Sequence, residues 1–355
     1  MLTRLFPTPE FLSVPAVGVD FSDATMRFVR LSETMHGLLP VHFAEMAIPD
    51  GCMKGGRIVD EKLFTKFLQD VRTTHKLKYV RVAIPESQTY SFTLNLDPLA
   101  GADIRSAIEL VLEDNIPLRA VETVFDYHVI SESASSILVQ IVAIAQSSVE
   151  SFLDCFMRAG LIPLSFELDG QAMARAVLRP EELGSYMVVD FGANRTSITI
   201  VTKRTAVFTS TLEFGGKALL DILQKELSIP LEEAQRLKRE HGLSAMGEHA
   251  NIFQLLVGGI STLKDEINRR YVYWHEKKVQ RGEFPKIETV YLCGGHSNLR
   301  GLADYLSVGL KLRVVQANPW VNCISFDAAV PDMSYETSMS YVTAIGLALA
   351  EYIHD

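Results

Sequence analysis

Short apolar runs alternate with amphipathic stretches along almost the whole chain. Residues 16–21, 26–32 and 39–48 have the length and spacing of strands joined by short turns, which predicts an antiparallel meander. Residues 60–75 place apolar side chains at helical spacing, and 78–85 form another apolar, strand-like run. Strands that alternate with helices in this way are typical of the α/β class.

The stretch 88–162 has a different rhythm, which predicts a compact inserted subdomain. Alternation at 89–96 indicates a strand, and 102–116 has the spacing of a helix that Asp103 could cap. Two further strands and a second helix ending at Gly160 follow. The expected order of the insert is therefore β-α-β-β-α.

Two segments repeat one pattern, "GVDFSDATMRFV" at 18–29 and "VVDFGANRTSIT" at 188–199. In both, an apolar strand ends in Asp-Phe, turns through small residues and returns as a strand. The two aspartates, Asp20 and Asp190, lie 170 positions apart, and this repetition predicts two related lobes. The expected organisation is a lead-in at 1–15, a first lobe at 16–87 and 163–187, the insert at 88–162, and a second lobe at 188–355.

The two aspartate turns suggest a site for a metal-bound polyphosphate. A tight turn of small residues leaves backbone amides free for an anion, and an adjacent carboxylate can hold Mg²⁺ through water. The stretch "CGGHSNLRG" follows an apolar strand and is expected to open a helix, which favours phosphate or a flat base. His296 within it is expected to be a solvated turn residue. No Walker A loop is present in the sequence.

The order of these motifs resembles that of the actin-like ATPases, and within them the PilM family of type IV pilus assembly proteins. The most similar stretches are "TSTLEFGGKALLDILQKELSIPLEEAQRLKREHG", "LKDEINRRYVYW" and "VTAIGLAL". The likeness extends from Ala16 to Ala350. It implies a duplicated ribonuclease-H-like core with ATP and Mg²⁺ between the two lobes.

The resemblance also implies roles for particular residues. Asp20 and Asp190 would face the metal and, with Asp169, form the catalytic set. Further nucleotide contacts would come from Ser22, Asp23 and Arg27 in the first hairpin and from Gly192, Asn194 and Thr196 in the second. Gly215, Gly216, Gln235 and Lys238 would lie on the ribose side, and Gly294, Gly295 and Asn298 on the adenosine side.

Four positions depart from the family pattern. Ser22 stands where glycine is usual, and its Cβ is expected to crowd a turn that favours positive φ. Arg27 replaces a usual lysine, and Gln235 replaces a glutamate that would bind ribose. Asp169 aligns with a glutamate that orients water, and its side chain is one methylene shorter. We therefore expect ATP binding with slow or absent hydrolysis.

The resemblance further implies that the insert and the first lobe form a groove for the cytoplasmic N-terminal tail of a PilN-like membrane protein. The protein would then be cytoplasmic and peripheral to the inner membrane through that partner, and self-association stays open. Candidate groove residues lie on the insert's helix and just after it, although ordinary core packing is an equal alternative for the last two: Ile108, Leu112, Ile116 and Leu118.

The composition of the chain argues against some classes of function. The 355-residue chain has a net charge of -9, which argues against broad nucleic-acid binding. Its four isolated cysteines favour reduced thiols, and no apolar run has the length of a membrane span. The alternatives are a small-molecule kinase of the same superfamily, a nucleotide-free adaptor and, last, an FtsA-like division protein, which usually carries a basic amphipathic C-terminal anchor that "YIHD" lacks.

Overall fold

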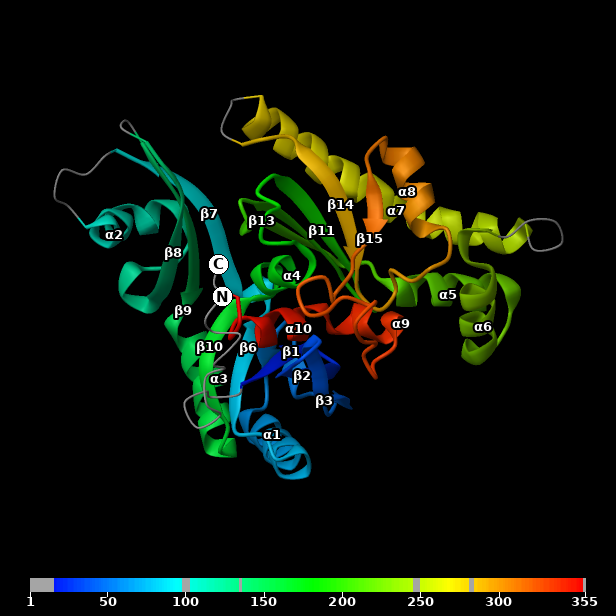
Figure 1. Cartoon of the computed structure of the whole chain (residues 1–355), viewed down its shortest axis with the longest axis horizontal. Coiled ribbons are helices and arrows are strands. Elements are labelled where there is room, and N and C mark those ends of the chain that lie inside the picture. Colours follow the sequence, from blue (N-terminus) through cyan, green and yellow to red (C-terminus); the bar gives the residue numbers. More distant parts are fainter. Residues whose placement is uncertain (1–15, 98–102, 134–135, 245–249, 281–283, 354–355) are drawn as a thin grey trace.

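The computed structural model describes residues 16–97, 103–133, 136–244, 250–280 and 284–353, and the lead-in expected at 1–15 lies outside them. Figure 1 shows two lobes and an inserted layer at one side. The first lobe contains a five-stranded sheet in the order β10-β6-β1-β2-β3. The meander is confirmed, since β1, β2 and β3 pair antiparallel, whereas β6 and β10 run parallel to β1 and to each other. Its strands are β1 Val17–Phe21, β2 Thr25–Thr34, β3 Gly37–Ala47, β6 Tyr79–Ile84 and β10 Ile162–Leu168.

The second lobe repeats this arrangement. Its sheet has the order β13-β12-β11-β14-β15, which matches the first sheet strand for strand when both are read in chain order. The predicted duplication is therefore confirmed at the level of topology, and Asp20 and Asp190 lie at the same place on equivalent central strands. The strands are β11 Ser185–Phe191, β12 Thr196–Thr202, β13 Thr205–Leu212, β14 Ile287–Cys293 and β15 Val314–Gln316; the helices are α5 Gly216–Leu227, α6 Leu231–His241, α7 Ala250–Trp274 and α8 Leu302–Leu310.

The insert forms its own sheet in the order β7-β9-β8, covered on one face by α2. Asp103 caps α2 as expected, because its carboxylate accepts a hydrogen bond from the Arg105 amide. The helix that follows β9, α3, packs its phenylalanines against α1 in the core of the first lobe. The lobe boundaries stay a prediction. The elements of this region are β7 Thr89–Leu96, α2 Ile104–Asn115, β8 Thr123–Glu132, β9 Ile137–Ala145 and α3 Gln146–Ala159. The first lobe also contains α1 Glu61–His75 and a hairpin of two short strands, β4 Met53–Lys54 and β5 Arg57–Ile58.

Two helices, α4 Asp169–Val177 and α10 Val342–Leu349, lie between the lobes at the centre of the molecule. They touch backbone to backbone, because a Cβ on Gly346 would lie 1.8 Å from the Ala172 carbonyl oxygen. A Cβ on Gly18 of β1 would likewise lie 2.0 Å from the Ala344 carbonyl oxygen. Glycine at these two positions therefore fixes the distance between the central helices and the first sheet. A short helix, α9 Tyr335–Ser338, precedes α10.

Two expectations from composition can be compared with the structure. All four cysteines are buried free thiols, as expected. Within the residues that the structure describes, no helix combines the length and the apolar character that a membrane span requires.

Candidate functional site

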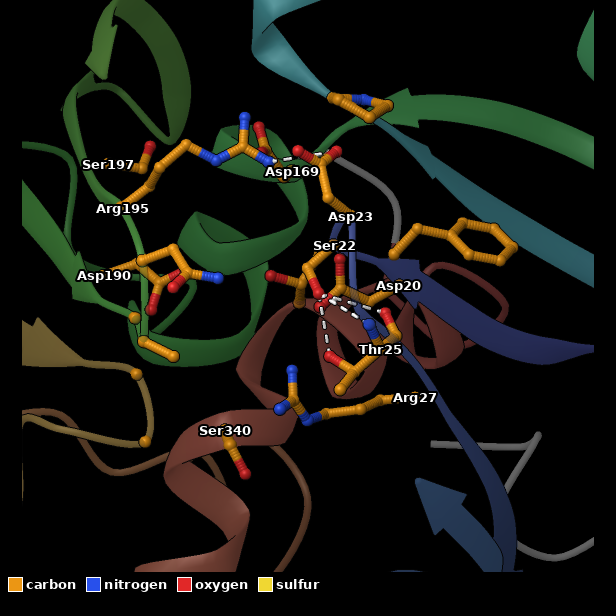
Figure 2. Close-up of a pocket in the computed structure, with 18 of the residues that line it drawn as sticks. Asp20, Ser22, Asp23, Thr25, Arg27, Asp169, Asp190, Arg195, Ser197 and Ser340 are labelled. Atoms are coloured by element: carbon orange, nitrogen blue, oxygen red, sulfur yellow. Dashed lines mark hydrogen bonds and ion pairs between the residues drawn. The ribbon is translucent and has the colours of Figure 1, made fainter. Parts of the chain in front are cut away.

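A cavity of about 550 Å³ opens between the lobes, where the equivalent strands β1 and β11 end (Figure 2). Ligand sites in α/β proteins are expected at the carboxyl ends of such strands. The cavity brings together ten of the predicted site residues from segments far apart in the chain: Asp20, Ser22, Asp23, Arg27, Asp169, Asp190, Gly192, Asn194, Gly294 and Gly295.

Asp20 and Asp190 face this cavity from opposite lobes. Burial raises the pKa of Asp20, although the nearby Arg27 guanidinium opposes the shift. Burial and the charge of Asp20 raise the pKa of Asp190 to about 7. Removing carboxylates from water and placing them near each other favours the protonated form. A divalent cation or another positive group between them would relieve this cost.

Asp169 stands at the first turn of α4, and its carboxylate accepts a hydrogen bond from the Gly170 amide at 2.8 Å. Burial and the neighbouring Glu86 raise its pKa well above the usual value. Burial also raises the pKa of Glu86. Burial and proximity therefore push both carboxyl groups toward the protonated form, and Asp169 already accepts a hydrogen bond from the Gly170 amide.

Glu86 is the main site residue that the sequence did not reveal. It follows the carboxyl end of β6, the parallel neighbour of β1. Site residues are expected at such strand ends, and this position could have identified Glu86 from the sequence. Its carboxylate accepts hydrogen bonds from hydroxyls of the second lobe, at 3.0 Å from Ser197 Oγ and 3.1 Å from Thr211 Oγ1. Arg195 lines the cavity as well and was also missed.

The first hairpin is closed by its own serine. The amides of Ala24 and Thr25 donate to Ser22 Oγ at 3.3 and 2.9 Å, so these amides are not free for a phosphate. The expected positive φ was wrong, because Ser22 does not have one. The structure does not support a phosphate contact for Asp23 either, because its carboxylate accepts hydrogen bonds from the amides of Gly55 and Gly56. In this hairpin the serine hydroxyl, rather than its Cβ, is the obstacle to an anion.

The second hairpin is more open. Gly192 closes it by donating its amide to the Arg195 carbonyl oxygen at 3.0 Å. In the described part of the chain, the amides of Ala193 and Asn194 donate to no other group. Gly294 lies beside this hairpin with φ of +90°, and a Cβ there would be 2.2 Å from Asp190 Oδ1. Glycine is required at this position because any side chain would meet the carboxylate.

Two arginines bring positive charge into the cavity. Arg27 lies opposite Asp20 in the β1–β2 ladder and pairs with Glu45, with 2.6 Å between Nε and Oε2. Arg195 reaches from the second lobe toward Asp23, at 3.6 Å between the guanidinium and the carboxylate (Figure 2). One cation from each lobe thus lines the cavity, and each is paired with a carboxylate.

The remaining predicted nucleotide residues lie behind the cavity wall or away from it. Thr196 is fully buried and donates its hydroxyl to the Phe214 carbonyl oxygen at 2.7 Å. Asn298 donates its side-chain amide to the Glu336 carbonyl oxygen. Gln235 is exposed on α6, whereas Lys238 is buried on the same helix. None of these four, nor Gly215 or Gly216, lines the cavity.

The glycine turn after β14 differs from expectation in two ways. It does not open directly into a helix, because α8 begins only at Leu302. His296 is half-buried and lines the cavity, and its Nδ1 lies 2.7 Å from Lys238 Nζ, so the prediction of a solvated turn histidine was wrong. Burial and Lys238 lower the pKa of His296 to about 4.

The donor set fits Mg²⁺ bound mainly through water and phosphate. No group of three or more His, Cys, Asp or Glu side chains in the described residues is arranged to hold a metal on its own. Magnesium commonly takes only one or two carboxylates and completes its shell with water and substrate oxygens. Asp20 and Asp190, carboxylates with raised pKa values on opposite sides of the cavity, suit that mode.

The predicted partner residues form the core of the insert. Ile108 and Leu112 have no exposed surface, and Ile116 is 5% exposed. They pack beneath the sheet with Phe125 and Val139, while Leu118 is partly buried against the same cluster. Core packing, the alternative given for Ile116 and Leu118, therefore describes these two residues, and Ile108 and Leu112 are core residues as well. Their helical spacing placed them on one face of α2, and that face turned out to be the one that packs inward.

Known proteins are similar to this chain over nearly its whole length. The family model for the type IV pilus assembly protein PilM matches residues 18–352. This chain belongs to the PilM family. The structure of a "PilM-PilN type IV pilus biogenesis complex" is similar over 96% of this chain and 99% of that chain, with a TM-score of 0.78 and 20% identity.

More distant relatives share the fold. EutJ from Carboxydothermus hydrogenoformans is similar over 97% of this chain and 91% of its own, with a TM-score of 0.53 and 20% identity. MreB5 of Spiroplasma citri, bound to AMPPNP, is similar over 94% and 95%, with a TM-score of 0.54 and 12% identity. FtsA of Neisseria meningitidis serogroup B is 30% identical over 109 residues, which are 30% of this PilM-family chain and only 26% of FtsA. The predicted actin-like ATPase fold is confirmed.

Proposed function

We propose that this PilM-family chain is an ATP-binding scaffold of type IV pilus assembly. The observation that carries the proposal is the meeting of Asp20 and Asp190 across one cavity, each at the end of an equivalent strand. Magnesium would lie between these carboxylates through water, and the amides of Ala193 and Asn194 would bind a phosphate. Arg27 and Arg195 would neutralise the remaining charge.

Hydrolysis by this site would be slow. A base that activates water needs a free carboxylate within reach of that water. Asp169 accepts from the Gly170 amide, and burial and the neighbouring Glu86 raise its pKa. The Glu86 carboxylate is itself engaged by second-lobe hydroxyls. The geometry thus supports a protein that holds nucleotide in order to join its lobes, and not one that turns it over rapidly.

Thermal unfolding with and without Mg·ATP tests the nucleotide proposal. A ligand present at about 100 times its Kd adds about 2.7 kcal/mol of stability, which shifts the midpoint measurably. We expect a shift in the wild-type protein that Asp190→Ala abolishes. The matched control is Asp304→Asn, an exposed aspartate on α8, which should retain the shift. No shift in any protein would indicate a nucleotide-free adaptor.

We further propose that the chain binds the cytoplasmic N-terminal segment of a PilN-like protein and is thereby recruited to the inner membrane. Support for a PilN-like partner comes from the similarity of this chain to the structure of a PilM–PilN complex. Three exposed apolar side chains next to the insert are the candidates for contact, Leu153 and Met157 on α3 and Leu164 on β10, at 39%, 52% and 40% exposure. Among the described residues, β10 is also an edge strand of the first sheet, and an edge strand is suited to pairing with an extended peptide.

Fluorescence anisotropy with a labelled peptide from the PilN-like protein of the same cell tests this second proposal. Met157→Glu should weaken binding by about tenfold or more, because it places a charge in an apolar contact. Val308→Glu is the control, since Val308 is an exposed apolar residue on α8 in the other lobe. The proposed surface would be contradicted if both variants weakened binding equally, or if neither weakened it.

A further inference from the structure

The resemblance on which the proposed ATP site rests would put the nucleoside beside Gly216 and Lys238, and His296 occupies that place. Its imidazole packs directly over the first residue of α5, because a Cβ on Gly216 would be 2.1 Å from His296 Cγ. The ring also meets Phe191 edge-on, with 6.1 Å between the centroids. There is consequently no room between Gly216 and the imidazole for a ribose or a base.

Specific contacts hold the ring in this place. Lys238 Nζ lies 2.7 Å from Nδ1 and 3.4 Å from the Gly216 carbonyl oxygen. The His296 amide donates to the Phe191 carbonyl oxygen at 3.0 Å. Burial lowers the pKa of Lys238 to about 8, and the pKa of His296 is about 4. At neutral pH a largely charged ammonium therefore donates to a neutral imidazole, which is a charge-assisted hydrogen bond.

The two halves of the cleft differ in how much open space they contain. The half near Asp20, Asp190 and Asn194 is an open cavity, which His296 borders. The half near Gly216 and Lys238 lies outside that cavity and holds the imidazole. A phosphate chain and a magnesium ion could enter the first half without disturbing the second.

We propose that His296 is a built-in occupant of the nucleoside half, and that it decides which ligand the cleft accepts. At rest the site takes a magnesium-bound polyphosphate, and adenosine enters only when His296 leaves Lys238. The incoming ribose would then replace the imidazole, with a hydroxyl oxygen accepting from Lys238 Nζ. This inference rests on the proposed ATP site and names what limits its affinity.

Isothermal titration with Mg·ATP and with Mg·tripolyphosphate, which lacks the nucleoside, tests the inference. His296→Ala should tighten Mg·ATP binding by about tenfold or more, equivalent to about 1.4 kcal/mol, because adenosine no longer competes with a side chain. Binding of Mg·tripolyphosphate should change by less than about twofold on the same scale. His128→Ala, which alters an exposed histidine on β8, should change neither affinity.

The outcomes separate this inference from the function on which it rests. Equal Mg·ATP affinity in the wild-type protein and His296→Ala would overturn the role of His296 and leave nucleotide binding standing. Binding of Mg·tripolyphosphate without Mg·ATP in both proteins would overturn it too. Failure of both ligands in every protein would remove the proposed ATP site itself. Should His296→Ala fail to fold, His296→Asn provides the same comparison.

A direct measurement on the wild-type protein complements the variants. The imidazole signals of His296, followed by NMR through a pH titration, report whether the ring stays buried beside Lys238. Mg·ATP should raise the pKa of His296 from about 4 toward its ordinary value, because the ring moves into water. Mg·tripolyphosphate should leave this pKa low. A pKa that Mg·ATP does not alter would contradict the displacement.

Discussion

Glu86 Oε2 lies 3.0 Å from Ser197 Oγ, and this hydrogen bond joins the first lobe to the second at the wall of the cleft. The same carboxylate accepts from Thr211 Oγ1 at 3.1 Å. Glu86 also lies beside Asp169, so one side chain connects the lobe interface to a second carboxyl group of the cavity. Any movement of one lobe relative to the other must break or reorganise these bonds.

Replacing Glu86 should therefore loosen the cleft. Glu86→Ala leaves hydroxyls of the second lobe without their acceptor, and should lower the free energy of unfolding by about 1–3 kcal/mol in urea denaturation. Glu86→Gln keeps one acceptor oxygen and should cost less than the alanine variant. An unchanged unfolding free energy in Glu86→Ala would contradict a role in joining the lobes.

The carboxylates of the cleft should make the protein less stable as the pH rises. The pKa of Asp190 is about 7 in the folded protein, above its ordinary value of 3.8. Its contribution to stability is therefore fully present below about pH 4 and is lost as the pH rises through about 7. Asp20, Asp169 and Glu86 shift in the same direction.

Asp190→Asn removes one of these titrations. Its unfolding free energy should fall less steeply than that of the wild-type protein between pH 5 and 8, with a difference of at most a few kcal/mol (roughly 1.4 per pKa unit). Urea denaturation at several pH values, with Asp304→Asn as the control, measures this. Parallel profiles for wild type and Asp190→Asn would show that Asp190 titrates normally.

Ser22 limits anion binding through its hydroxyl. Both Ser22→Ala and Ser22→Gly remove Oγ and release the amides of Ala24 and Thr25. Either variant should tighten Mg·tripolyphosphate binding by about three- to tenfold, the effect of about one hydrogen bond. If only the glycine variant binds more tightly, the Cβ is the obstacle instead. Isothermal titration distinguishes the two.

The close approach of the central helices makes Gly346 irreplaceable. In Gly346→Ala the new methyl group would overlap the Ala172 carbonyl, since the separation is only 1.8 Å. We expect a loss of several kcal/mol, comparable to severe overpacking, or failure to fold. Gly258→Ala in α7 is the matched control, because a Cβ there would meet no described atom within 4 Å apart from its own helix backbone. It should stabilise the protein by about 0.5–1 kcal/mol in thermal or urea unfolding.

Local patterns predicted the elements well because they depend on nearby residues. Alternation predicted the meander of β1, β2 and β3, and helical spacing predicted α1 and α2. The repeated Asp-Phe turns revealed the duplication, which the two matching sheets confirm. They also located Asp20 and Asp190, since a carboxylate that ends an apolar strand is visible without knowledge of its neighbours.

Other residues could not be interpreted from the sequence. Spacing put Ile108 and Leu112 on one face of a helix, but could not say whether that face met a partner or the insert's own sheet. Nothing near Glu86 in the chain indicates that it accepts hydrogen bonds from strands more than a hundred residues away. Such contacts depend on how separate elements pack.

The sequence by itself determined the class of the fold, the duplication and the two aspartate turns, because periodicity and turn chemistry are local properties. Tertiary structure alone decided that Glu86 joins the two lobes and that His296 fills the space over Gly216. The physical reason is that free amides and empty space are set by the contacts that remain after folding. The same motif therefore has amides that the serine hydroxyl occupies in the first hairpin, whereas in the described part of the chain those of Ala193 and Asn194 in the second donate to no other group.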